Sequence, residues 1–144
     1  MRAALIAVLV CAACATQPRS RMATGMVVSD EEVRAVIRRA LEADAANQPS
    51  DTLFTAGATI IANGKARLSP PRFAGIGRGG LLALQSLSVE MSPPLAWGEA
   101  RYQWGTRGGT SFQAGAATFI LEHTDHWRIV HAHSSTPLPW IPNQ

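Results

Sequence analysis

The stretch "GAATFILEHTDHWRIVHAHSS", residues 115–135, decides the fold because it has the pattern of two strands joined by a tight turn. On both sides of Thr124-Asp125 the residues suit extended chain, in which successive side chains point to opposite faces of a sheet. Thr124-Asp125 has the size and polarity of a two-residue hairpin loop. The stretch therefore predicts an antiparallel β-hairpin.

Counting outward from that loop gives the expected register, in which Thr118 lies opposite His131 and Ala116 lies opposite His133. One face of the hairpin would then carry Ala116, Thr118, Ile120, Glu122, Trp127, Ile129, His131 and His133. His131 and His133 share that face, about 6.6 Å apart at roughly 3.3 Å per residue.

All four histidines of the chain fall within eleven residues, which raises the question of a metal site. His126 and His131 are about 16 Å apart along one strand and point to opposite faces, so the four cannot share one ion. His131 and His133 could supply two ligands, but their expected neighbours, Thr118 and Ala116, supply no third. We therefore expect no metal.

Two interpretations of His131 and His133 stay open. In the first, they sit in a semi-polar interior and hydrogen-bond to hydroxyls such as that of Ser135. In the second, they line a pocket, where they bind or polarise a ligand and one of them acts as a general base.

Residues 29–47 predict an amphipathic helix. Ser29 and Glu32 have the spacing of a capping box, and Pro49 ends the segment. The apolar residues at helical spacing are Val33, Val36, Ile37, Ala40 and Leu41. Because both faces of the predicted hairpin are largely apolar, this helix would cover one face. A second subunit or a ligand-filled cavity would cover the other.

The rest of the chain is dominated by strand and turn signals. Asn63-Gly64 is a hairpin-type turn signal, and residues 66–80 are rich in glycine and proline, as loops are. Residues 81–91 suggest a short helical turn that enters a strand, and residues 95–107 suggest a long strand. One helix followed by a mostly antiparallel sheet is an α+β fold.

Within the strand expected at residues 95–107, Tyr102 and Trp104 lie on the more apolar face, with Glu99 and Arg101 on the other. Tyr102 and Trp104 are candidate ligand-binding residues as well as packing residues, because each carries a polar atom that needs a partner. Arg128 is flanked by apolar positions and could anchor an acidic ligand group.

The first residues predict export. Arg2 precedes an apolar stretch of about ten residues that is too short to span a bilayer, as in a secretory signal peptide. The small residues before Cys14 resemble a bacterial lipobox, although Cys11 stands where leucine is usual. The resemblance implies lipidation of Cys14 and outer-membrane sorting, whereas plain secretion with cleavage nearby is the alternative. Residues 1–13 would be the signal peptide and residues 14–28 a flexible tether.

Composition excludes two classes. With 47% hydrophobic and 16% charged residues, the chain is globular rather than disordered. Its formal charge of +3 is small and scattered, whereas a nucleic-acid surface needs clustered basic residues, so we expect no nucleic-acid partner.

The strand-turn-strand of residues 115–135, together with the helix before it, resembles the NTF2-like superfamily. Within it the chain is most similar to SnoaL-like domains and to the association domain of calcium/calmodulin-dependent kinases. The resemblance spans residues 29–136, which leaves residues 137–144 as a tail. It implies an α+β cone, with an N-terminal amphipathic helix packed on a curved, mostly antiparallel sheet. It also implies an open cavity and homodimers that form through the sheet.

The functions that this resemblance implies are of three kinds. The first is an envelope-tethered lipoprotein that binds a small apolar or weakly acidic molecule in its cavity. The expected ligand-binding residues are Tyr102, Trp104, Arg128, His131 and His133. The second is an isomerase, lyase or hydrolase with His131 or His133 as general base; Asp44, Asp51 and Glu90 match no enzyme motif of the family. The third is a dimeric protein-interaction module, and none of the three calls for a cofactor.

Overall fold

The computed structural model describes residues 29–137. The predicted signal peptide, the lipidation site Cys14, the tether and most of the tail lie outside these residues. The described elements, in chain order, are helix α1 (Asp30–Ala45), the short 3₁₀ helix η1 (Asp51–Leu53), and strands β1 (Phe54–Ala62), β2 (Lys65–Ala66), β3 (Gly80–Ser92), β4 (Leu95–Thr106), β5 (Phe112–His123) and β6 (Trp127–Ser135).

Helix α1 forms where the apolar spacing predicted it, and it buries one stripe against the sheet. Val33, Ile37 and Leu41 are fully shielded from solvent, and the stripe continues through Asp44. The predicted capping box is wrong in one respect, because the Ser29 side chain makes no capping hydrogen bond. Instead, the Ser29 carbonyl accepts the backbone N–H of Glu32 at 3.2 Å.

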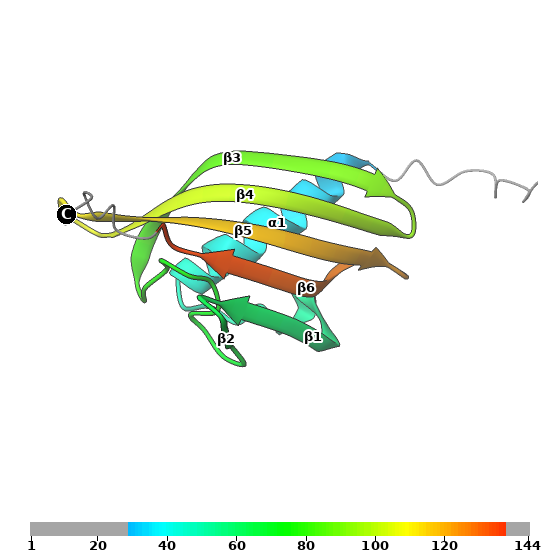
Figure 1. The fold of residues 1–144 in the computed structure, drawn as a ribbon, viewed down its shortest axis with the longest axis horizontal. Coiled ribbons are helices and arrows are strands. Elements are labelled where there is room, and N and C mark those ends of the chain that lie inside the picture. Colours follow the sequence, from blue (N-terminus) through cyan, green and yellow to red (C-terminus); the bar gives the residue numbers. More distant parts are fainter. Residues whose placement is uncertain (1–28, 138–144) are drawn as a thin grey trace, which may run out of the picture.

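The strands of residues 29–137 form one sheet in the order β2-β1-β6-β5-β4-β3, with α1 packed across one side of it (Figure 1). All neighbouring strands are antiparallel except β1 and β6, which run parallel. A parallel neighbour needs a long connection, and the whole of β2 to β5 lies between β1 and β6 in the chain. The α+β architecture with a mostly antiparallel sheet is therefore confirmed.

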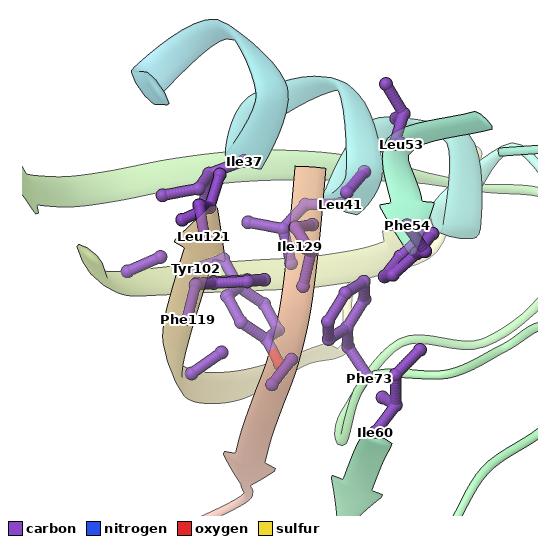
Figure 2. Packing of buried hydrophobic residues seen from close by; sticks show 14 of the residues in the cluster. Ile37, Leu41, Leu53, Phe54, Ile60, Phe73, Tyr102, Phe119, Leu121 and Ile129 are labelled. Carbon is purple, nitrogen blue, oxygen red and sulfur yellow. The ribbon is translucent and has the colours of Figure 1, made fainter. Parts of the chain in front are cut away.

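Burial alternates along the strands as the period of two requires. In β4 the inward residues include Ala100, Tyr102 and Trp104, as the sequence predicted. Figure 2 shows how the inward side chains of the sheet meet Ile37 and Leu41 of α1. The side of the sheet toward α1 is called the helix face below, and the opposite side the open face.

Two local predictions have different outcomes. Asn63-Gly64 forms the β1–β2 turn with φ of 48° and 74°, which is the left-handed region that Asn and Gly tolerate best. The helical turn expected within residues 81–91 is wrong, because the segment is strand throughout β3. Long-range pairing with β4 outweighs the local helix preference of its leucines.

Candidate functional site

The segment of residues 67–79, called the plug loop below, packs into the helix face of the sheet. Arg72, Phe73, Ala74 and Ile76 are buried, and Phe73 and Ile76 belong to the hydrophobic core. The ring of Phe73 lies 5.4 Å from that of Phe119, and Figure 2 shows it among the buried side chains of α1, β1 and β5. The chain thus uses its own loop to fill space beneath the sheet.

Asp44 of α1 holds the plug loop by its backbone. Its carboxylate accepts the N–H of Arg72 at 2.7 and 2.8 Å and that of Phe73 at 2.9 Å. Burial raises the pKa of Asp44, while the hydrogen bonds from Phe73 and Arg72 and the Arg72 charge oppose that rise. A carboxylate occupied by backbone amides in this way anchors a loop and is not free to act as a base.

The side chain of Arg72 fastens the same loop to the start of β1. Its guanidinium donates to the Ser50 hydroxyl at 3.1 Å and to the Asp51 carboxylate, and it lies 5.1 Å above the Phe54 ring. Removing this charge from water is tolerated because both an anion and an aromatic face meet it. Arg72 is therefore a second structural anchor.

Tyr102 and Trp104 serve packing in this structure. The Tyr102 hydroxyl donates to the Ala74 carbonyl at 2.7 Å, and the Ala74 N–H donates to the Ser134 hydroxyl at 2.9 Å. Burial, followed by the charge of Asp44, raises the pKa of Tyr102, which keeps the phenol protonated as a donor. The predicted ligand platform is thus covered by the plug loop.

The β5–β6 register differs from the predicted one, and the prediction is wrong for two reasons. His123 pairs with Trp127, which makes the loop three residues long, 124–126, rather than two. A β-bulge then falls between the Leu121–Ile129 pair and the Ile120–His131 pair.

The bulge decides where the histidines point. Trp127 and Ile129 face the helix side and are buried, but beyond the extra residue Ala132 and Ser134 take over that side. His131 and His133 share a face, as predicted, but it is the open face, where they neighbour Ile120 and Thr118. No hydrogen bond to either imidazole is found within residues 29–137, so no carboxylate or hydroxyl there orients them as a base.

Arg128 lies apart from both groups, at the β5–β6 loop. Its Nε donates to Nε2 of His126 at 2.7 Å, and its terminal nitrogen donates to Asp125 at 3.1 Å. The five residues predicted to line one site are therefore distributed over three places: the core, the open face and the loop.

The open face instead presents a row of apolar side chains with charged groups beside them. Trp97 pairs with Ile120 across β4 and β5, and the two are 41% and 39% exposed. Leu95 precedes them on the same side of β4 and is 45% exposed. A shallow hollow of about 210 Å³ next to this row has Glu99 and His133 on its walls.

No family model matches this chain, and no curated protein matches it. Solved structures do. A protein with a cystatin-like fold from Nostoc punctiforme aligns over 78% of this chain and 93% of its own, at 9% identity and a TM-score of 0.64. An NTF2-like superfamily protein from Salmonella enterica covers 76% of this chain and 91% of its own, at 20% identity and a TM-score of 0.58.

The chain has the NTF2-like fold. An NTF2-like protein of unknown function from Pseudomonas putida has the same fold. It aligns over 76% of this chain and 87% of its own, at 17% identity and a TM-score of 0.59. At such identities the likeness concerns the fold and carries no residue-level role.

Two further observations concern the described part of this NTF2-like fold. Within residues 29–137, no three histidine, cysteine, aspartate or glutamate side chains gather as metal ligands would. The same residues contain no helix with the length and hydropathy needed to cross a bilayer.

The signal that would have found Asp44 was present in the sequence. Asp44 lies seven residues after Ile37 and three after Leu41, on the same stripe of α1 that is buried. A carboxylate in a buried helical stripe needs specific donors. The N–H groups that donate to Asp44, however, belong to a loop almost thirty residues later in the chain. No local sequence pattern connects Asp44 with that loop.

Proposed function

We propose that this domain is an assembly module that pairs with a second copy of itself through the open face of its sheet. The observation that supports this proposal is the contrast between the two faces. α1 and the plug loop pack the helix face, while Leu95, Trp97 and Ile120 stand exposed on the open face. An exposed apolar row with charged groups beside it is characteristic of a protein interface.

The size of the open face is adequate for a dimer. β3 to β6 place four neighbouring strands side by side, and β4 and β5 are each 12 residues long. At roughly 4.8 Å between strands and 3.3 Å per residue, this area is on the order of 750 Å² per copy. Stable protein–protein interfaces bury about 800 Å² per partner.

The charges on this face suit a second copy related by a two-fold axis along β5. Thr118 of β5 pairs with Glu99 on one side and with His133 on the other. Such an axis places Glu99 opposite His133 of the partner subunit, and Trp97 opposite His131 of the partner subunit. Acid would then meet imidazole twice in one interface, which is the self-complementarity that a two-fold contact requires.

The proposal predicts an association that depends on Glu99. In the two-fold arrangement each Glu99 lies opposite His133 of the partner subunit, so the contact occurs twice in one interface. Glu99→Gln should weaken the dimer about tenfold, which corresponds to about 1.4 kcal/mol from the two contacts together. Sedimentation velocity of the wild-type protein and of the variant measures the dissociation constant.

Matched variants make the test specific. Trp97→Glu should give a monomer, and His133→Ala should weaken association while leaving some of it. Leu68→Glu places the same charge on a leucine that is 92% exposed and belongs to the plug loop rather than to the apolar row of the open face, so association should persist. A wild-type protein that stays monomeric at millimolar concentration would rule out the proposal.

The place of action is also proposed from the sequence. The pattern of residues 1–13 supports export, and the small residues before Cys14 support a lipid anchor at the outer membrane, facing the periplasm. Cys14→Ser should then move the protein from the membrane fraction to the soluble fraction. The sequence of residues 115–135 supports a SnoaL-like domain within the NTF2-like fold.

A further inference from the structure

We infer that the groove between α1 and the β5–β6 loop binds a small monocarboxylic acid with an apolar body. The groove lies at the edge of the helix face, away from the open face, and its volume is about 450 Å³. Small-molecule sites have volumes of roughly 300 to 1,000 Å³. Its walls come from α1, from η1, and from the end of β5 with the loop after it, which contribute His123 and His126.

The groove has an apolar floor suited to a hydrocarbon body. Leu53 of η1 and Trp127 of β6 line it, and both are buried by more than nine tenths. Val36 of α1 is half-buried and extends the same surface. An acyl chain or ring laid on these side chains would leave water on one side only.

One residue that lines the groove carries a buried donor without a partner. The indole Nε1 of Trp127 is shut away from solvent and has no hydrogen-bond acceptor within residues 29–137. A buried donor without an acceptor is unfavourable, so a ligand oxygen that reached Nε1 from the groove would gain a hydrogen bond. The His123 ring meets the Trp127 ring edge-on at 5.1 Å and adds a second N–H-bearing group to the same wall.

The charges select an anion at one end of the groove. Arg34 and Arg38 of α1 are paired with Asp30 and Glu31, whereas no ion pair to Arg39 is found in residues 29–137. Arg39 lines the groove and supplies a guanidinium that can hold a carboxylate in a bidentate contact.

The other end of the groove disfavours a second anion. Glu32 lines the groove seven residues before Arg39, about 10.5 Å along the helix at 1.5 Å per residue. A diacid long enough to span the groove would bring its second carboxylate to Glu32. Asp125, on the opposite wall, is already engaged by His126 and Arg128. The preferred ligand therefore has one carboxylate, directed to Arg39, and an apolar end toward Glu32.

The test compares three eight-carbon probes of equal length: octanoate, octanamide and suberate. Amide chemical shifts of the full chain, recorded during titration with each probe, report both the dissociation constant and the place of binding. Octanoate should shift amides around Val36, Leu53 and Trp127, and should bind at least tenfold more tightly than octanamide or suberate.

Four variants decide the assignment. Arg39→Gln should weaken octanoate binding about tenfold without changing octanamide binding, and Arg38→Gln, whose arginine is paired with Glu31, should leave both unchanged. Trp127→Phe should weaken octanoate binding. Trp104→Phe, which alters the other unpaired buried indole, should leave octanoate binding unchanged. Equal effects of the Arg38 and Arg39 variants, or shifts that map to the core around Trp104, would overturn the inference. Because Trp97→Glu lies on the other face, unchanged octanoate binding in that variant separates this result from dimerisation.

Discussion

The two faces of the sheet have the same alternation in sequence but opposite environments in the structure. On the helix face, Tyr102 and Phe119 are fully buried beneath α1 and the plug loop. On the open face, Trp97 and Ile120 lie on the same two strands, β4 and β5, and remain about 40% exposed. What separates these residues is not their hydrophobicity but which side of the sheet the chain itself covers.

The comparison teaches that the interior and the open face require different kinds of evidence. On the helix face, one chain supplies both the packing and the hydrogen-bond partners of buried groups such as the Asp44 carboxylate and the Tyr102 hydroxyl. The apolar side chains of the open face are removed from water only if another molecule contacts them. Function in this fold is therefore more reasonably sought on its surfaces than beneath its sheet.

The largest expected effect on stability concerns Phe73 of the plug loop, on the buried helix face. Phe73→Ala should lower the free energy of unfolding by about 4 kcal/mol, because a buried ring is lost and a cavity remains. Phe112→Ala removes the same atoms from β5 at a ring that is 65% exposed, and should change stability by less than about 0.5 kcal/mol. Urea denaturation of both variants measures the difference. Similar losses for the two would show that the plug loop is not part of the core.

The next effect concerns the anchor of that loop. Asp44→Ala should cost about 2 to 3 kcal/mol, because the N–H groups of Arg72 and Phe73 lose their acceptor while remaining buried. Asp30→Ala is the matched control, since its carboxylate is 57% exposed and pairs with Arg34 on the surface of α1. Its effect should stay below about 1 kcal/mol. Amide exchange of residues 72 and 73 gives a second reading, and unchanged protection in Asp44→Ala would contradict the anchor.

The sequence predicted the parts of this fold that local period controls. The stripe of α1, the inward face of β4 and the Asn63-Gly64 turn all follow from spacing and turn chemistry. The general fold followed from the resemblance of residues 115–135, where the hairpin itself was correct.

The candidate site was less predictable, because it depended on one extra residue. A β-bulge next to Val130 shifts the strand by one position, and a shift of one exchanges the two faces for every later side chain. His131 and His133 were therefore placed on the side of Trp127 in the prediction, and the structure puts them on the other. The plug loop was read correctly as a loop, but glycine and proline content says nothing about whether a loop is buried.

The smallest expected effect concerns the β5–β6 loop, and it is a change in the pKa of Asp125. The Thr124 hydroxyl donates to Asp125 at 2.8 Å and is the main reason that the pKa of Asp125 falls from 3.8 to about 2, with the charge of Arg128 acting in the same direction. A carboxyl whose pKa is lowered by folding stabilises the fold above its ordinary pKa, and this contribution disappears as the pH falls from 3.8 through about 2. Thr124→Val should raise the pKa of Asp125 toward its ordinary value, and carboxyl chemical shifts during acid titration measure it. Thr118→Val, which removes a hydroxyl from the open face, should leave that pKa unchanged. A shift of the same size in both variants would mean that the Thr124 hydrogen bond does not set the acidity of Asp125.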